Sequence, residues 1–140
     1  MSEVSQLGQD GPVDLEMAAA ALLANNKDVK MMLRVLGKTL QDSVGDRVEI
    51  VRQGGGLLHR QPEDVKKITV HLGPDDYEAQ LDGRSVQCSV ARSSGGIRIR
   101  NEQLPVEQWL SRLLGALQKE AANNQSARTA LQNVILGGNT

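Results

Sequence analysis

Apolar and polar residues alternate at every second position in five short runs between Arg47 and Arg100. Successive side chains on a strand point to opposite faces, so this period predicts strands with one buried face and one wet face. The apolar positions are Val48 and Ile50; Ile68, Val70 and Leu72; Tyr77, Ala79 and Leu81; Val86, Cys88 and Val90; and Ile97 and Ile99. We expect these side chains to face a core on one side of an antiparallel sheet.

The segments between the runs have compositions typical of tight turns. They are Gly73-Pro74-Asp75-Asp76, Asp82-Gly83 and Ser93-Ser94-Gly95-Gly96. No helix-length segment separates these runs, so an antiparallel meander of four to five strands is predicted in preference to parallel crossovers. Asp75 and Asp76 are expected to be turn residues that bond their own backbone, not a catalytic carboxylate pair.

Segments with helical spacing flank the strands on both sides. An apolar stripe over residues 29–44 predicts a helix, and an Ala- and Leu-rich helix is expected before it over residues 13–24. After the strands, Pro105 suits the first turn of a long helix, and a last amphipathic helix follows Asn123-Asn124. The order predicts an α+β fold in which N- and C-terminal helices pack on one face of the meander.

The chain has 140 residues, of which 39% are hydrophobic, and this composition suits one domain with a true core. We expect the domain to span residues 13–136, between a disordered tail at 1–12 and a flexible end at 137–140. There is no Phe, and there is one Trp and one Tyr. Trp109 is therefore predicted to be the largest apolar anchor between a helix and the sheet.

Charge and cysteine content narrow the functional classes. The chain carries 16 basic and 17 acidic residues, and the strand region between Arg47 and Arg100 is only mildly basic. That balance falls short of the footprint of a protein that binds through phosphate neutralisation. The single Cys88 excludes an internal disulfide and favours a reducing compartment. With no signal peptide or membrane-spanning run in the sequence, a cytoplasmic location is expected.

A glycine-rich segment, Gln53–Arg60, carries basic residues and two adjacent leucines. It lacks the Lys-Ser/Thr pair of a phosphate-binding loop, so a mobile hairpin loop is favoured over an anion cradle. Two adjacent leucines on a loop are costly to expose unless they fold back or meet a partner. Leu57 and Leu58 are therefore candidate partner-binding residues.

The two histidines, His59 and His71, have no second ligand at metal spacing. The alternation also places His71 and Cys88 on opposite faces of the sheet, which disfavours a thiol–imidazole pair. We therefore predict no metal site, no cofactor and no catalytic residues. An enzyme ranks third, behind a binding module and a nucleic-acid-associated protein.

Arg98 and Arg100 are expected to point the same way from the last strand, with Arg92 nearby and Lys67 further across the same wet face, and they are a candidate basic patch. Glu49 and Glu78 share that face and can pair with these cations, so a solvated, charge-protected edge is favoured.

The final amphipathic segment offers a further candidate surface in Leu131, Val134 and Ile135. These side chains either complete the core or dock on a second copy or a different protein, and we favour docking.

Short sequence blocks spread over most of the chain resemble a family of uncharacterised small actinobacterial proteins. The blocks are Val48-Glu49-Ile50, the glycine-rich segment, Lys67-Ile68-Thr69-Val70, Tyr77-Glu78-Ala79 and Leu104-Pro105-Val106-Glu107-Gln108-Trp109-Leu110. The resemblance implies no activity, and a looser likeness to small nucleoid-associated bacterial proteins is one of fold only. The sequence therefore predicts a non-catalytic adaptor or regulatory protein-binding module, self-associating as a homodimer or other homo-oligomer. The alternative is a nucleic-acid-associated protein that uses the basic patch.

Overall fold

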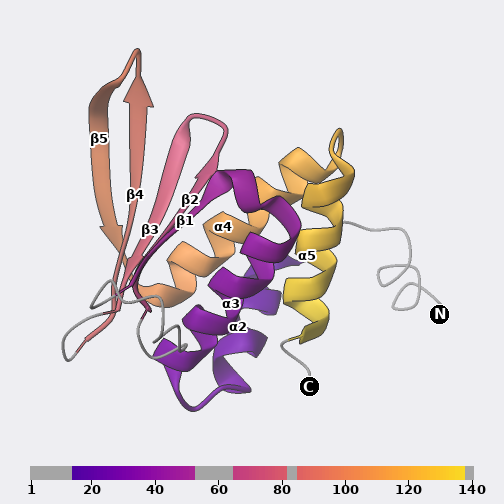
Figure 1. The fold of residues 1–140 in the computed structure, drawn as a ribbon. Coiled ribbons are helices and arrows are strands. Elements are labelled where there is room, and N and C mark those ends of the chain that lie inside the picture. The colour runs from indigo at the N-terminus through magenta and orange to yellow at the C-terminus, as the bar shows by residue number, and fades with distance from the viewer. Residues whose placement is uncertain (1–13, 53–64, 82–84, 138–140) are drawn as a thin grey trace.

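Five antiparallel strands and four α-helices make up the described part of this computed structural model, residues 14–52, 65–81 and 85–137 (Figure 1). The strands follow one another in the sheet in chain order, so the predicted α+β meander is confirmed. The elements are α2 (Leu15–Ala24), α3 (Val29–Val44), the 3₁₀ turn η1 (Gly45–Arg47), β1 (Val48–Arg52), β2 (Val65–Leu72), β3 (Asp75–Gln80), β4 (Gln87–Ser94), β5 (Ile97–Leu104), α4 (Val106–Ala121) and α5 (Gln125–Gly137). The expected N-terminal tail, the Asp82-Gly83 turn and residues 138–140 lie outside the described residues.

The register of the ladders shows which side chains share a face. Val48, Val70, Tyr77 and Val90 pair in turn across four strands, and directly paired residues lie on the same face of a sheet. All four are buried. The alternation thus correctly identifies the core face of the first four strands.

Side-chain caps on neighbouring backbone groups define where the helices begin. Asp14 accepts a hydrogen bond from the backbone N–H of Met17, and Asp28 accepts one from that of Met31. Asn124 caps the start of α5 in the same way through the N–H of Ala127. The helix predicted over residues 13–24 ends at Ala24, and Asn25 is its C-cap residue.

The helices all lie on one side of the sheet (Figure 1). Helix α3 packs on β1 and β2, and α4 packs on β2 and β4. Helix α2 packs against α4, while α5 packs against both α3 and α4. Trp109 of α4 is 1% exposed and donates its indole N–H to the backbone carbonyl of Ser89 on β4, over 3.0 Å. The predicted anchor role of Trp109 is therefore confirmed.

Two hairpin turns are tighter than the sequence predicts. Gly73 and Pro74 alone connect β2 to β3, and Gly73 has a φ of 61°, which favours glycine. Gly95 and Gly96 alone connect β4 to β5, both with positive φ. Asp75 and Asp76 consequently lie in β3, so the prediction that they are turn residues is wrong.

The prediction that Ile97 and Ile99 face the core is also wrong. Their side chains are 68% and 61% exposed, and every residue of β5 before Leu104 is exposed. The β4–β5 hairpin extends past the edge of the helical layer (Figure 1), so no described helix covers its outer half. None of the described helices combines the length and apolar character that crossing a bilayer requires.

Candidate functional site

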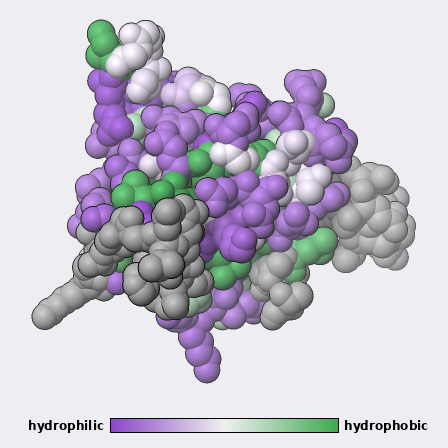
Figure 2. All heavy atoms as spheres, in the orientation of Figure 1, coloured by the Kyte–Doolittle hydropathy of each residue, from purple (hydrophilic) through white to green (hydrophobic). Residues whose placement is uncertain are grey.

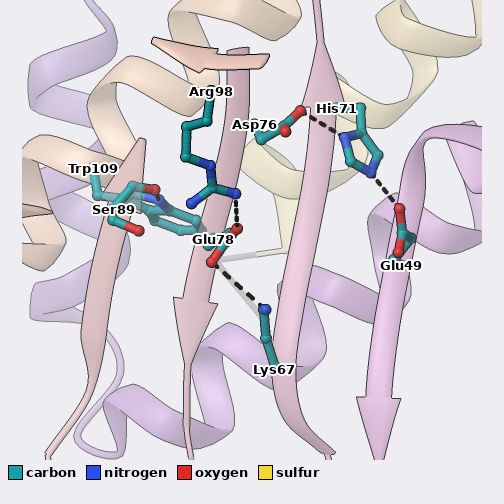
Figure 3. A network of polar contacts seen from close by, with 8 residues as sticks. All are labelled: Glu49, Lys67, His71, Asp76, Glu78, Ser89, Arg98 and Trp109. Atoms are coloured by element: carbon teal, nitrogen blue, oxygen red, sulfur yellow. Dashed lines mark hydrogen bonds and ion pairs between the residues drawn. The ribbon is translucent and has the colours of Figure 1, made fainter. Parts of the chain in front are cut away.

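The exposed face of the sheet carries a histidine held between two carboxylates (Figure 3). His71 on β2 lies with Nδ1 2.6 Å from Oδ1 of Asp76 on β3 and with Nε2 2.5 Å from Oε2 of Glu49 on β1. The three side chains therefore link three neighbouring strands. They sit together because His71 pairs directly with Asp76 and lies diagonally across from Glu49.

This geometry favours the charged form of His71. A neutral imidazole has one N–H donor, while an ionised carboxylate only accepts, so two such contacts require the imidazolium form. The hydrogen bond to Asp76 raises the pKa of His71 above its ordinary value, partial burial opposes that shift, and Glu49 raises the pKa further. Both ring nitrogens are engaged, and neither is available as a general base or a metal ligand in this arrangement.

A second group on the same face centres on Glu78 of β3 (Figure 3). Its carboxylate lies 3.7 Å from Nζ of Lys67 and 3.2 Å from Nη2 of Arg98. One carboxylate thus holds two cations from β2 and β5. These charges neutralise much of one another, and exposed pairs of this kind each contribute about 0–1 kcal/mol to stability.

The three arginines of the candidate basic patch are not gathered on one face. Arg92 pairs with Arg100 on β5, but Ser93 pairs with Arg98, which leaves Ile99 as a β-bulge. A bulge inserts an extra residue, so the alternation of faces shifts across it. Arg98 lies on the exposed face with Glu78, whereas Arg92 and Arg100 lie on the helix side beyond the helices. The expectation that Arg98 and Arg100 point the same way is wrong.

Arg92 binds the carboxylate of Asp75, a residue that was predicted to lie in a turn. Its Nε lies 2.9 Å from Oδ1 of Asp75, and its Nη2 lies 3.2 Å from Oδ2, a bidentate arrangement. These contacts raise the pKa of Arg92. Arg100 has no ion-pair partner among the described residues. Of the three predicted cations, only Arg100 is open to an incoming anion.

Cys88 is buried on the helix side of β4, and burial raises the pKa of its thiol to about 12. A thiol with so high a pKa is protonated at neutral pH and is a poor nucleophile. Within residues 14–52, 65–81 and 85–137, no three His, Cys, Asp or Glu side chains gather in a way that could hold a metal ion. The glycine-rich segment, with Leu57, Leu58 and His59, lies outside the described residues.

The last helix contributes to the protein's own core. Leu131 and Val134 are buried, and Ile135 is partly buried against the core. In the single chain, Leu131 and Val134 complete the core, which is the first of the two alternatives for this segment. Leu136, next to them, is the exposed apolar residue of α5.

A shallow groove lies between the end of α2, residues 28–39 at and within the start of α3, and α5. Its volume is about 150 Å³, and its lining includes Leu22, Leu36 and Val134. Met31 and Val35 on α3 also line it and are exposed. They fall on the side of α3 outside its predicted core stripe. Apolar residues on the expected polar side of a helix are the sequence signal that could have pointed to this groove.

No family model, curated protein or solved structure matches this chain. The described residues form a small α+β domain in which the helices cover one face of the sheet, and β1 and β5 are its edges among the described strands.

Proposed function

We propose that this protein is a non-catalytic adaptor or regulatory module in the cytoplasm that binds other proteins and self-associates. The observation that carries the proposal is the exposure of Ile97 and Ile99 on the β4–β5 hairpin, past the helical layer. Figure 2 shows the end of this hairpin projecting from the surface, with apolar and weakly polar atoms at its tip.

Exposed apolar surface gathered on one projecting element is typical of interaction sites. Burial of an isoleucine side chain contributes about 1.5–3 kcal/mol relative to full exposure. Ile97 and Ile99 remain exposed in the folded single chain, so burying them in an interface would stabilise a complex. The groove beside Met31 and Val35 is a second apolar surface and supports the same class of function.

The nucleic-acid alternative has less support from the arrangement of charge. Asp75 neutralises Arg92, and Glu78 holds both Arg98 and Lys67. A phosphate-binding surface needs cations that are free to replace counterions, and the described residues place Arg98 and Arg100 on opposite faces.

The experiment compares the wild-type protein with an Ile97→Ser/Ile99→Ser variant in affinity capture from a native lysate and in a mass measurement of the purified protein. Val51→Ser is the matched control, because Val51 is an exposed apolar residue on β1, the opposite edge of the sheet. We expect the double variant to lose associated protein, and the control to keep it.

Two results would contradict the proposal. One is a wild-type protein that stays monomeric and captures nothing. The other is a generic DNA duplex that binds tightly and loses affinity steeply as salt rises, which supports the nucleic-acid alternative.

A further inference from the structure

Strand β5 is one edge of the sheet, and β4 is its only neighbour among the described strands. An edge strand presents unpaired backbone N–H and C=O groups, which are a template for another strand. The bulge at Ile99 interrupts the outer half of this edge, whereas the part from Arg100 to Leu104 pairs regularly with β4. The regular part of the edge, to which no other described strand pairs, is therefore the inner half of β5.

Charge on this inner half is unbalanced in a way that a partner strand can correct. Arg100 lies directly opposite Arg92, whose charge Asp75 neutralises through a bidentate contact. No carboxylate in the described ranges pairs with Arg100. A carboxylate on an incoming strand would supply the missing partner of Arg100.

We propose that β5 pairs antiparallel with β5 of a second copy, about a two-fold axis through Asn101, so that the two sheets join into one. This inference rests on the proposed function and names the partner in self-association.

The position of the axis follows from sheet geometry. Directly paired residues share a face, and a two-fold axis perpendicular to the sheet keeps each face on its own side, so the axis passes through a residue. An axis at Arg100 or at Glu102 would place that residue directly opposite the same residue of the second copy, so that two like charges face each other. An axis at Asn101 sets Arg100 against Glu102 twice. It also brings the two Asn101 amides together, and each amide both donates and accepts.

Glu102 is available for this contact. Its Oε1 accepts a hydrogen bond from Nη1 of Arg112 on α4, over 3.1 Å, and about half of its side chain is exposed, 47%. A carboxylate has about four lone-pair sites, so Glu102 can bind Arg112 and the partner's Arg100 together. With the axis at Asn101, residues 100–102 of the two regular segments face each other, and Gln103 lies opposite the bulged Ile99 of the partner. The interface is therefore small, and the dimer belongs to the weak, concentration-dependent class.

The first test is a charge exchange followed by sedimentation velocity over a range of protein concentration. Arg100→Glu sets Glu against Glu, and we expect dimer affinity to fall by about tenfold or more. The double variant Arg100→Glu/Glu102→Arg restores opposite charges across the axis and is expected to regain the dimer. Lys119→Glu, the same change of charge on an exposed part of α4, is the control and should leave affinity unchanged.

The second test maps the register by disulfide formation. Asn101→Cys places two thiols on the axis, where paired Cα atoms lie about 4.5–5.5 Å apart, within disulfide range. Gln103→Cys places them four residues out of register, about 13 Å apart, and should not cross-link. Cys88 does not interfere, because its thiol is buried. Both changes fall on an exposed edge, so the fold is expected to persist, and circular dichroism checks this.

The outcomes separate this inference from the broader function. A dimer that resists Arg100→Glu, or that cross-links at Gln103→Cys and not at Asn101→Cys, overturns the β5 pairing and leaves self-association standing. A wild-type chain that stays monomeric at every concentration overturns both the pairing and the self-association. Loss, rescue and cross-linking as described establish the pairing.

Discussion

Strands β2 and β5 have similar alternating sequences and opposite environments. Ile68 and Val70 on β2 are 2% and 0% exposed beneath α3 and α4, whereas Ile97 and Ile99 on β5 are among the most exposed apolar residues described. Both strands pair with a neighbour, β2 without irregularity and β5 with one bulge at Ile99, so pairing alone does not explain the difference. The difference lies in how far the helices reach across the sheet.

This contrast separates two properties that one sequence pattern encodes together. Alternation predicts that a strand has an apolar face. Burial of that face depends on a second element that arrives from elsewhere in the chain. Where the second element is missing, the apolar residues add little to folding and remain available for association.

Trp109→Ala is the change with the largest expected effect on this comparison. It removes the side chain that joins α4 to β4, and large-to-small changes of this kind cost about 3–5 kcal/mol. Ile99→Ala on the uncovered strand is the control, expected to change stability by less than about 0.5 kcal/mol. Chemical denaturation of both variants checks the prediction. An unchanged midpoint for Trp109→Ala would remove this residue from the core.

Gly37→Ala tests how closely the helical layer lies on the covered strand. A Cβ at Gly37 would lie 2.8 Å from Cδ1 and 3.2 Å from Cγ1 of Ile68, and Ile68 is itself buried. We expect a loss of about 1–3 kcal/mol from overpacking.

Two companion variants sharpen this measurement. Gly115→Ala on α4 meets nothing closer than 3.8 Å and should be neutral or stabilising through helix propensity. Adding Ile68→Val to Gly37→Ala removes the contacting Cδ1 atom and should recover part of the loss. If Gly37→Ala proved as stable as Gly115→Ala, α3 would not pack closely on β2.

The smallest expected effect concerns the exposed face of β2. The pKa of His71 is raised in the folded protein, so its contribution to stability is fully present below about pH 6.5, its ordinary pKa. That contribution is lost as pH rises through the folded pKa. The side chain is 38% exposed, so screening limits it to less than about 1 kcal/mol.

The measurement is the free energy of unfolding across this pH range for the wild type and for His71→Gln. The variant should lack the component that falls with rising pH. Equal pH profiles for the two proteins would show that the carboxylate contacts of His71 do not stabilise the fold.

Local patterns were sufficient to predict the type and order of the elements. Alternation identified the core face of the first four strands, and helical spacing identified α3 and α4. The bulge at Ile99 was not predictable, because Ile97-Arg98-Ile99-Arg100 has the pattern of a regular strand. The bulge is visible only in the pairing with β4, and it decides on which face each arginine lies.

Tight turns explain the other difference between prediction and structure. Gly73 and Pro74 suffice to reverse the chain, so Asp75 and Asp76 lie in β3 and not in the turn. There they bind Arg92 and His71. Sequence alone counts these four residues as one turn, because each residue type favours turns individually. The role of the last helix depended likewise on long-range packing that no local pattern contains.

The order of elements along the chain also affects how the protein is made. On the ribosome, all five strands are synthesised before α4 and α5. Of the helices that pack on the sheet, only α3 has then been made, so it alone can cover the apolar face. At synthesis rates of about 5–20 residues per second, this half-covered state lasts for several seconds. The nascent chain therefore passes through an interval in which it is vulnerable to aggregation and open to chaperones.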